Sequence, residues 1–158
     1  MSEGRPLTRA EWSVLSSGLV DALKASGAEP RIVSRAHPAA RVVGLWRGAT
    51  PVLTRGNVIL WPNATENLGA DRRTAAVLQH ELQHVLDYRT GRMSAARYLI
   101  DPREWVYDHD LANGTPFGAL GAEQRATLAE RLWMAENGYG DVANIDTLRG
   151  VIPWAARA

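Results

Sequence analysis

The sequence predicts an α+β fold in a single domain covering residues 1–158. Three observations support this. Helical spacing of apolar residues occurs near the N-terminus and in the second half, β-like runs lie between, and 158 residues suit one domain. Apolar residues make up 46% of the chain, which is enough for a buried core. We expect that core to span about 6–137, followed by a C-terminal tail over 138–158.

The first predicted element is a helix over 8–25. Thr8 followed by Glu11 matches a capping box, in which each residue's side chain binds the other's backbone N–H. Gly27 suits the end of such a helix. The apolar positions that recur at helical spacing are Trp12, Leu15, Leu19 and Leu23.

Three β-like runs follow, over 31–36, 41–46 and 50–61. The last is interrupted by Arg55-Gly56-Asn57, which predicts a hairpin turn. A small antiparallel or mixed sheet is therefore expected, and a loop should lead from it to about residue 70.

The second half of the chain reads as helical. A second helix is predicted over 71–90, closed by Gly91, and a short one over 94–99. A loop over 113–116 then precedes a helix over 122–137, which Gly138 stops.

The chemistry concentrates on the second predicted helix, in the pattern His80-Glu81-x-x-His84. Histidines four residues apart project from one helix face about 6 Å apart and can bind one Zn²⁺ together. Glu81 is then placed to take a proton from a water on the metal. Because the chain has no cysteine, any metal must be held by histidine and carboxylate. The competing interpretation is a buried helix whose histidines are only hydrogen-bonded.

Two further acidic positions have to be weighed. Asp87 continues the histidine stripe and is a candidate to accept the other ring N–H of a ligand histidine, or else it is a surface aspartate. A hydrolytic zinc site needs a third protein ligand, and Glu123 opens the last predicted helix. Spacing alone leaves the third ligand open between Glu123 and a second group, namely Glu104, Asp108, His109 and Asp110.

Residues 80–91 resemble the active-site helix of gluzincins, the thermolysin-like zinc peptidases. A longer stretch, over 6–135, resembles a bacterial group of zincin-like metallopeptidases that are Vgr-related and found near contractile secretion systems. The shared segments are 6–8 with Glu11, 56–59, 107–111, and Phe117 leading into 121–126. The chain departs from the group at His109, where tyrosine is usual, and at Arg125, which replaces a glutamine.

The resemblance implies a zincin-like fold with the active-site helix followed by a ligand-bearing helix. It favours Glu123 as the third zinc ligand beside His80 and His84, with Glu81 as the general base. It also implies an additional oxyanion donor, Tyr107 or His109. Finally, it implies an edge strand at Asn57, Val58 and Ile59 that pairs with extended substrate.

The predicted function is therefore a zinc metallopeptidase with Zn²⁺ as cofactor and a peptide or protein as substrate. The alternative is a catalytically silent binding or assembly protein associated with a secretion system. Nucleic acid is not an expected partner, because 18 basic and 17 acidic residues are balanced and unclustered. No membrane association is expected. The sequence predicts a cytoplasmic protein, or one exported by a dedicated secretion system without a cleaved signal peptide.

Overall fold

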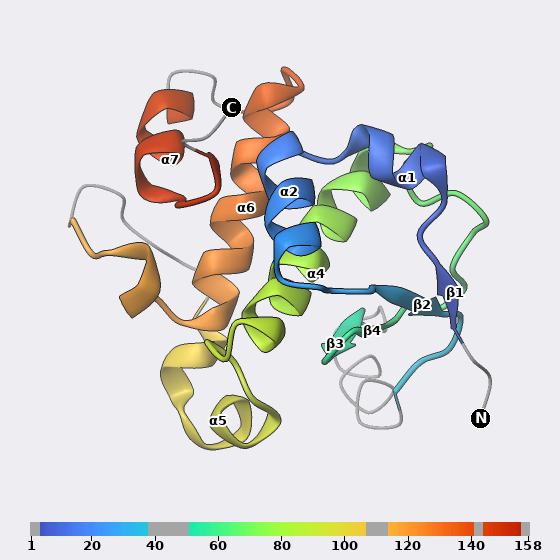
Figure 1. Cartoon of the computed structure of the whole chain (residues 1–158), viewed down its shortest axis with the longest axis horizontal. Coiled ribbons are helices and arrows are strands. Elements are labelled where there is room, and N and C mark those ends of the chain that lie inside the picture. Colours follow the sequence, from blue (N-terminus) through green and yellow to red (C-terminus); the bar gives the residue numbers. More distant parts are fainter. Residues whose placement is uncertain (1–3, 38–50, 107–113, 141–143, 156–158) are drawn as a thin grey trace.

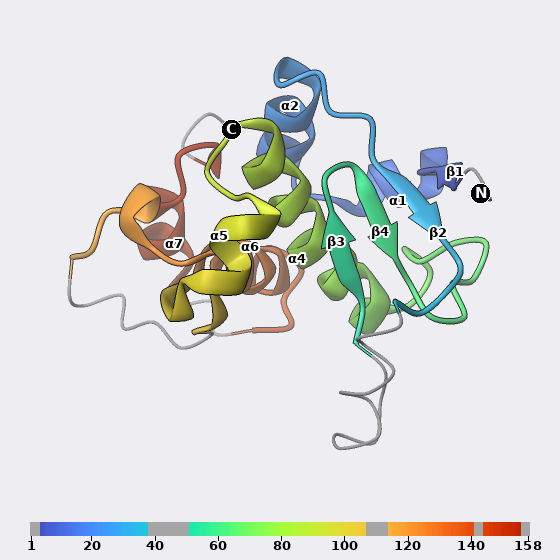
Figure 2. The same cartoon turned by 90° about the horizontal axis from the view of Figure 1, so that it is seen from below.

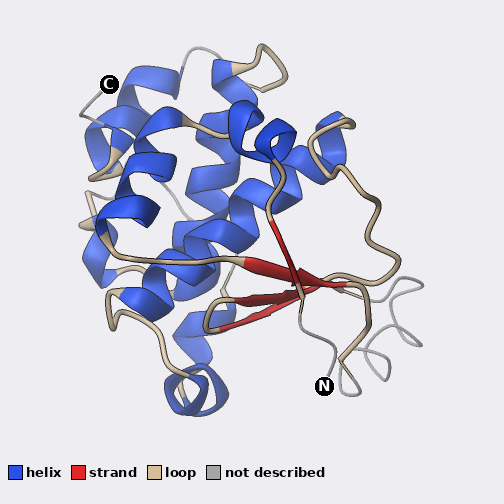
Figure 3. Cartoon of the chain, turned by 45° about the vertical axis from the view of Figure 1, so that its right-hand side comes forward, coloured by secondary structure: helices blue, strands red, loops and turns tan. Residues whose placement is uncertain are grey.

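The predicted α+β class is confirmed. The computed structural model describes residues 4–37, 51–106, 114–140 and 144–155. A four-stranded sheet lies at one side, and the long helices lie together beside it (Figures 1 and 3). The sheet packs against helix α4 (Arg72–Arg89), which in turn packs along α6 (Ala122–Glu136).

The sheet has the order β1-β2-β4-β3 and is mixed. β2 and β4 are parallel, whereas β1 pairs with β2 and β3 pairs with β4 in antiparallel fashion. The predicted hairpin is confirmed: its turn is Gly56-Asn57, and Gly56 adopts a φ of 62° that favours glycine. The predicted run 41–46 lies outside the described residues. The strands are β1 (Arg5–Pro6), β2 (Arg31–Val33), β3 (Leu53–Arg55) and β4 (Val58–Leu60).

The predicted helix over 8–25 is in fact two helices, α1 (Arg9–Val14) and α2 (Ser17–Ala25). Its capping box is present as expected. The break comes at Leu15, whose ψ of 156° is extended. Ser16 is held there by two distant helices, since its N–H donates to Gln79 on α4 and its hydroxyl to Glu136 on α6. Local spacing could not reveal those partners.

The second half follows the prediction closely. α4 is capped by Asp71, whose side chain accepts from two backbone N–H groups. The short predicted helix is α5 (Ala95–Ile100), and α6 agrees with its predicted range within one residue. Two 3-10 turns, η1 (Pro102–Trp105) and η3 (Phe117–Ala119), were not predicted. No helix in the described part of the chain is long and apolar enough to cross a bilayer.

The expected tail contains a helix, α7 (Ile145–Val151), that packs on α6. Leu148, Ile152 and Trp154 are buried in the main core. The Trp154 indole N–H donates to Gln83 on α4 at 2.8 Å. The prediction of a tail over 138–158 was therefore wrong for these residues, because a seven-residue helix has too few apolar positions to show helical periodicity.

Glu11 organises the N-terminal part of the fold. Its fully buried carboxylate accepts two hydrogen bonds from Arg5, one from the backbone N–H of Thr8 and one from that of Leu68. It thereby ties β1, α1 and the loop before α4 together. Burial opposes its ionisation, but these donors outweigh burial and lower the pKa of Glu11 to about 2.

We expect Glu11→Gln to lower the free energy of unfolding by about 2–3 kcal/mol at neutral pH, because charge-assisted hydrogen bonds are lost. Because the pKa of Glu11 is lower in the folded state, its charge stabilises the fold at pH values above 4.5, the ordinary pKa. This stabilisation is lost as pH falls toward 2. Urea unfolding at several pH values should show the difference between the two proteins shrinking as pH falls from about 4.5 toward 2. The exposed Glu29 provides the control: Glu29→Gln should behave as wild type throughout.

A second prediction concerns the contact between α2 and the C-terminal segment. Alanine for glycine inside a helix ordinarily stabilises by about 0.5–1 kcal/mol. At Gly18 a Cβ would overlap the backbone carbonyl of Trp154, so Gly18→Ala should instead destabilise by about 1–3 kcal/mol. Gly150 in α7 has no atom near its Cβ position, so Gly150→Ala should stabilise. Equal thermal shifts for both variants would contradict the packing described here.

Candidate metal centre

Three side chains from two helices converge at one point. His80 and His84 come from successive turns of α4, and Glu123 comes from the first turn of α6. Their ligand atoms all lie within 4.8 Å of one another, in a group that could hold a metal ion. Nε2 of His80 is 3.2 Å from Oε2 of Glu123, and Nε2 of His84 is 3.5 Å from its Oε1.

The helix geometry explains this placement. Residues four apart lie on one helix face, and the two imidazole rings stand edge to face with centroids 5.0 Å apart. α4 and α6 lie side by side (Figure 2). Their packing brings Glu123 up to both rings. His84 and Glu123 are buried, and His80 is half-buried.

The electrostatics of the group favour a positive charge on His80. Burial disfavours a charged His80, but hydrogen bonds to Glu123 and Glu130 outweigh it and raise its pKa to about 10. Burial likewise opposes ionisation of Glu123, yet its contacts with both histidines hold its pKa well below the usual range. A bound cation would take the place of the proton that these groups otherwise share.

The donor set suits a divalent metal. Two imidazole Nε2 atoms and one carboxylate form the His₂Glu combination of three-ligand zinc sites. Both Nε2 atoms face Glu123, and the other ring nitrogen of His80 lies 3.1 Å from Glu130. A carboxylate in that position fixes the ring orientation and leaves Nε2 for a metal.

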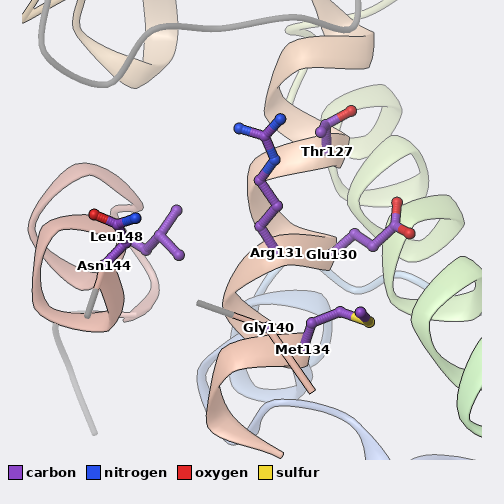
Figure 4. Close-up of a pocket in the computed structure, with 7 residues that line it drawn as sticks. All are labelled: Thr127, Glu130, Arg131, Met134, Gly140, Asn144 and Leu148. Carbon is purple, nitrogen blue, oxygen red and sulfur yellow. The ribbon is translucent and has the colours of Figure 1, made fainter. Parts of the chain in front are cut away.

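Sequence reasoning missed two residues beside this group. Glu130 extends from α6 toward α4 and is one of the residues that line a cavity of about 370 Å³ between α6 and α7 (Figure 4). Tyr98 on α5 donates its hydroxyl to Oε1 of Glu123 at 2.7 Å. Glu130 lies seven residues after Glu123, on the same helix face, which is a signal that could have identified it.

Glu81 follows His80 and is buried. Its Oε2 accepts a hydrogen bond of 2.7 Å from the hydroxyl of Thr54 on β3. Its negative charge acts on His80 and helps to raise the pKa of that residue. A strand from the sheet thus orients the carboxylate of the His-Glu-x-x-His pattern, which the sequence had not indicated.

Asp87 differs from its predicted role. Its two oxygens accept from Gln83 at 2.9 Å and from Arg125 at 2.7 Å. Nδ1 of His84 is buried without a hydrogen-bond partner, so Asp87 does not accept from that ring. Burial raises the pKa of Asp87, with Arg125 opposing the rise. The aspartate is neither a surface residue nor a partner of His84, but half of a buried ion pair.

The alternative third ligands divide into two groups. Glu104 is fully buried, but it accepts from Arg97 at 2.6 Å and from the backbone N–H of Ala122 at 2.7 Å. It therefore caps the start of α6 and does not belong to the histidine group. The remaining predicted residues, Tyr107, Asp108, His109 and Asp110, lie outside the described residues.

The strand predicted to lie at the edge of the sheet and to pair with substrate lies one position inward from that edge in the described sheet. β4, which contains Val58 and Ile59, lies between β2 and β3, so its backbone is paired on both sides. Asn57 lies in the hairpin turn. Among the described strands, the edge strand beside α4 is β3, which precedes the turn. The sequence pattern indicated the hairpin but not which of its strands would face outward.

No protein-family model matches the chain, and neither a curated protein nor a solved structure matches it. The fold and the site alone therefore define its class: an α+β protein with a buried His-His-Glu group, contributed by two packed helices, that could hold a metal ion.

We expect purified protein to bind one divalent metal per chain, measured by mass spectrometry of native and metal-free samples. His84→Ala and Glu123→Ala should each lose it, because three ligands are the usual minimum for such a site. Glu29→Gln is the control, since it alters an exposed glutamate outside the group and should keep the metal. Metal retained by Glu123→Ala would show that another residue completes the site.

Proposed function

We propose that the protein is a zinc-dependent metallopeptidase. The observation that carries the proposal is that Glu123 closes on His80 and His84 while Glu81, within the same pattern, is held in place by a separate element. A site that only joined helices would need the three ligands but not an oriented fourth carboxylate. The comparisons with known proteins neither add to nor oppose this proposal.

In this proposal, metal binding and proton transfer are carried out by different residues. His80, His84 and Glu123 would hold the ion, which when bound supplies a Lewis acid that acidifies a water and polarises a peptide carbonyl. Glu81 would accept the proton of that water and return it to the leaving amine. Thr54 keeps Oε2 of Glu81 fixed through its hydroxyl.

The sheet offers a place for an extended substrate. β3 is the edge strand among the described strands, and it packs against α4. Its buried Thr54 contacts Glu81, so the edge runs past the proposed catalytic base. A peptide paired with β3 would be held by main-chain hydrogen bonds, largely independent of its sequence.

Glu81→Gln tests the mechanism. We expect peptide hydrolysis, followed with a library of quenched fluorescent peptides, to fall by about 10²–10⁴-fold, since that is the usual contribution of a general base. Metal content should stay at the wild-type value, because Glu81 is not a ligand. Thr54→Val should reduce the rate by about 5–10-fold, the equivalent of one hydrogen bond.

Two results would contradict the proposal. Full hydrolysis by metal-loaded Glu81→Gln would show that Glu81 is not the base. Wild-type protein that binds zinc but cleaves no peptide in the library would favour the binding or assembly protein instead.

A further inference from the structure

Tyr98 brings a phenol hydroxyl to the candidate metal centre from outside the two ligand helices. It lies on α5, a helix with no buried residue, and is itself half-buried. Its hydroxyl donates to Oε1 of Glu123 at 2.7 Å. The other oxygen of Glu123, Oε2, is the one nearest to Nε2 of His80.

The residue before Tyr98 reaches the same turn of α6 by a second route. Arg97 donates to Oε1 of Glu104 at 2.6 Å, and Oε2 of Glu104 accepts from the backbone N–H of Ala122 at 2.7 Å. Tyr98 therefore contacts the side chain of Glu123, and Arg97 is linked through Glu104 to the backbone of Ala122, the residue before Glu123. These two contacts hold the exposed helix α5 against the first turn of α6.

We propose that Tyr98 is a positioning residue that makes Glu123 bind the metal through Oε2 alone. The inference rests on the metal site of the proposed function. A carboxylate can bind a metal through one oxygen or both, and a strong donor on Oε1 makes that oxygen a poorer ligand. Binding through one oxygen leaves a coordination position open for water, which a hydrolytic site needs and a closed structural site lacks.

A different role for the same hydroxyl has a distinct signature. If the Tyr98 oxygen were itself a ligand, it would fill the open position and close the site. A tyrosinate ligand gives a charge-transfer absorption with Cu²⁺ or Fe³⁺, whereas a phenol that only donates a hydrogen bond to Glu123 does not.

The test compares Tyr98→Phe with wild type in the full chain. We expect zinc affinity, measured by competition with a chromophoric chelator, to fall by about 10–100-fold, the usual effect of losing a residue that orients a ligand. The visible absorption of the Co²⁺-loaded variant should become weaker, as the freed carboxylate binds through both oxygens and raises the coordination number. Circular dichroism should show an unchanged fold, since the ring remains.

Two control variants separate the hydroxyl from its surroundings. Tyr88→Phe makes the same change on the half-buried tyrosine of α4 and should keep the wild-type affinity and Co²⁺ spectrum. Leu99→Ala changes an exposed residue next to Tyr98 on α5 and should also keep that spectrum. A spectrum altered as much by Leu99→Ala as by Tyr98→Phe would overturn a specific role for the hydroxyl.

The remaining outcomes are equally decisive. An identical Co²⁺ spectrum and zinc affinity in Tyr98→Phe, with one metal per wild-type chain, would overturn this inference and leave the proposed function intact. A tyrosinate charge-transfer band in Cu²⁺-loaded wild type, absent in Tyr98→Phe, would also overturn it. Wild-type protein that binds no metal would overturn the inference and the proposed function together.

Discussion

Arg125 is only 1% exposed, so its charge has to be compensated inside the protein. It binds Asp87 on α4 at 2.7 Å, donates to the carbonyl of Leu120 and lies 4.0 Å from Glu104 in η1. These contacts join α4, α6 and the turn before α6 at one point. Separating Arg125 from Asp87 would leave two unpaired buried charges, which is energetically costly. The ion pair therefore restricts how α4 and α6 can pack.

That constraint determines the geometry of the candidate metal centre. Glu123 lies two residues before Arg125, in the helical turn whose backbone N–H at Ala122 is capped by Glu104. The position of Glu123 relative to His80 and His84 therefore depends on a network that does not touch the ligands. A site built on packed helices in this way is held more precisely than one built on loops.

Different faces of α4 contact three separate parts of the fold. His80 and His84 face the first turn of α6, Glu81 faces β3 through Thr54, and Gln83 binds the indole of Trp154. This is why the helix is buried over most of its length. It also means that the C-terminal segment, which the sequence had suggested was a tail, contributes to holding α4 in place.

The sequence by itself determined the elements whose signals are local. The capping box of Thr8, the hairpin turn at Gly56 and the helix carrying His80, Glu81 and His84 depend on residues a few positions apart, where helix and turn geometry dictate the outcome. Glu123 could be ranked first only through a resemblance, because no short-range rule links it to a helix more than thirty residues away.

Only the tertiary structure decided the rest. Among the described strands it placed β4 inside the sheet and β3 at the edge, and it paired Asp87 with Arg125. It also brought Tyr98 and Glu130 to the candidate metal centre and Thr54 to Glu81. Each of these depends on which surfaces pack together once the chain is compact. Buried charges and hydrogen-bonding groups find partners distant in sequence, because leaving them unpaired in the core costs more free energy than ordering the chain around them.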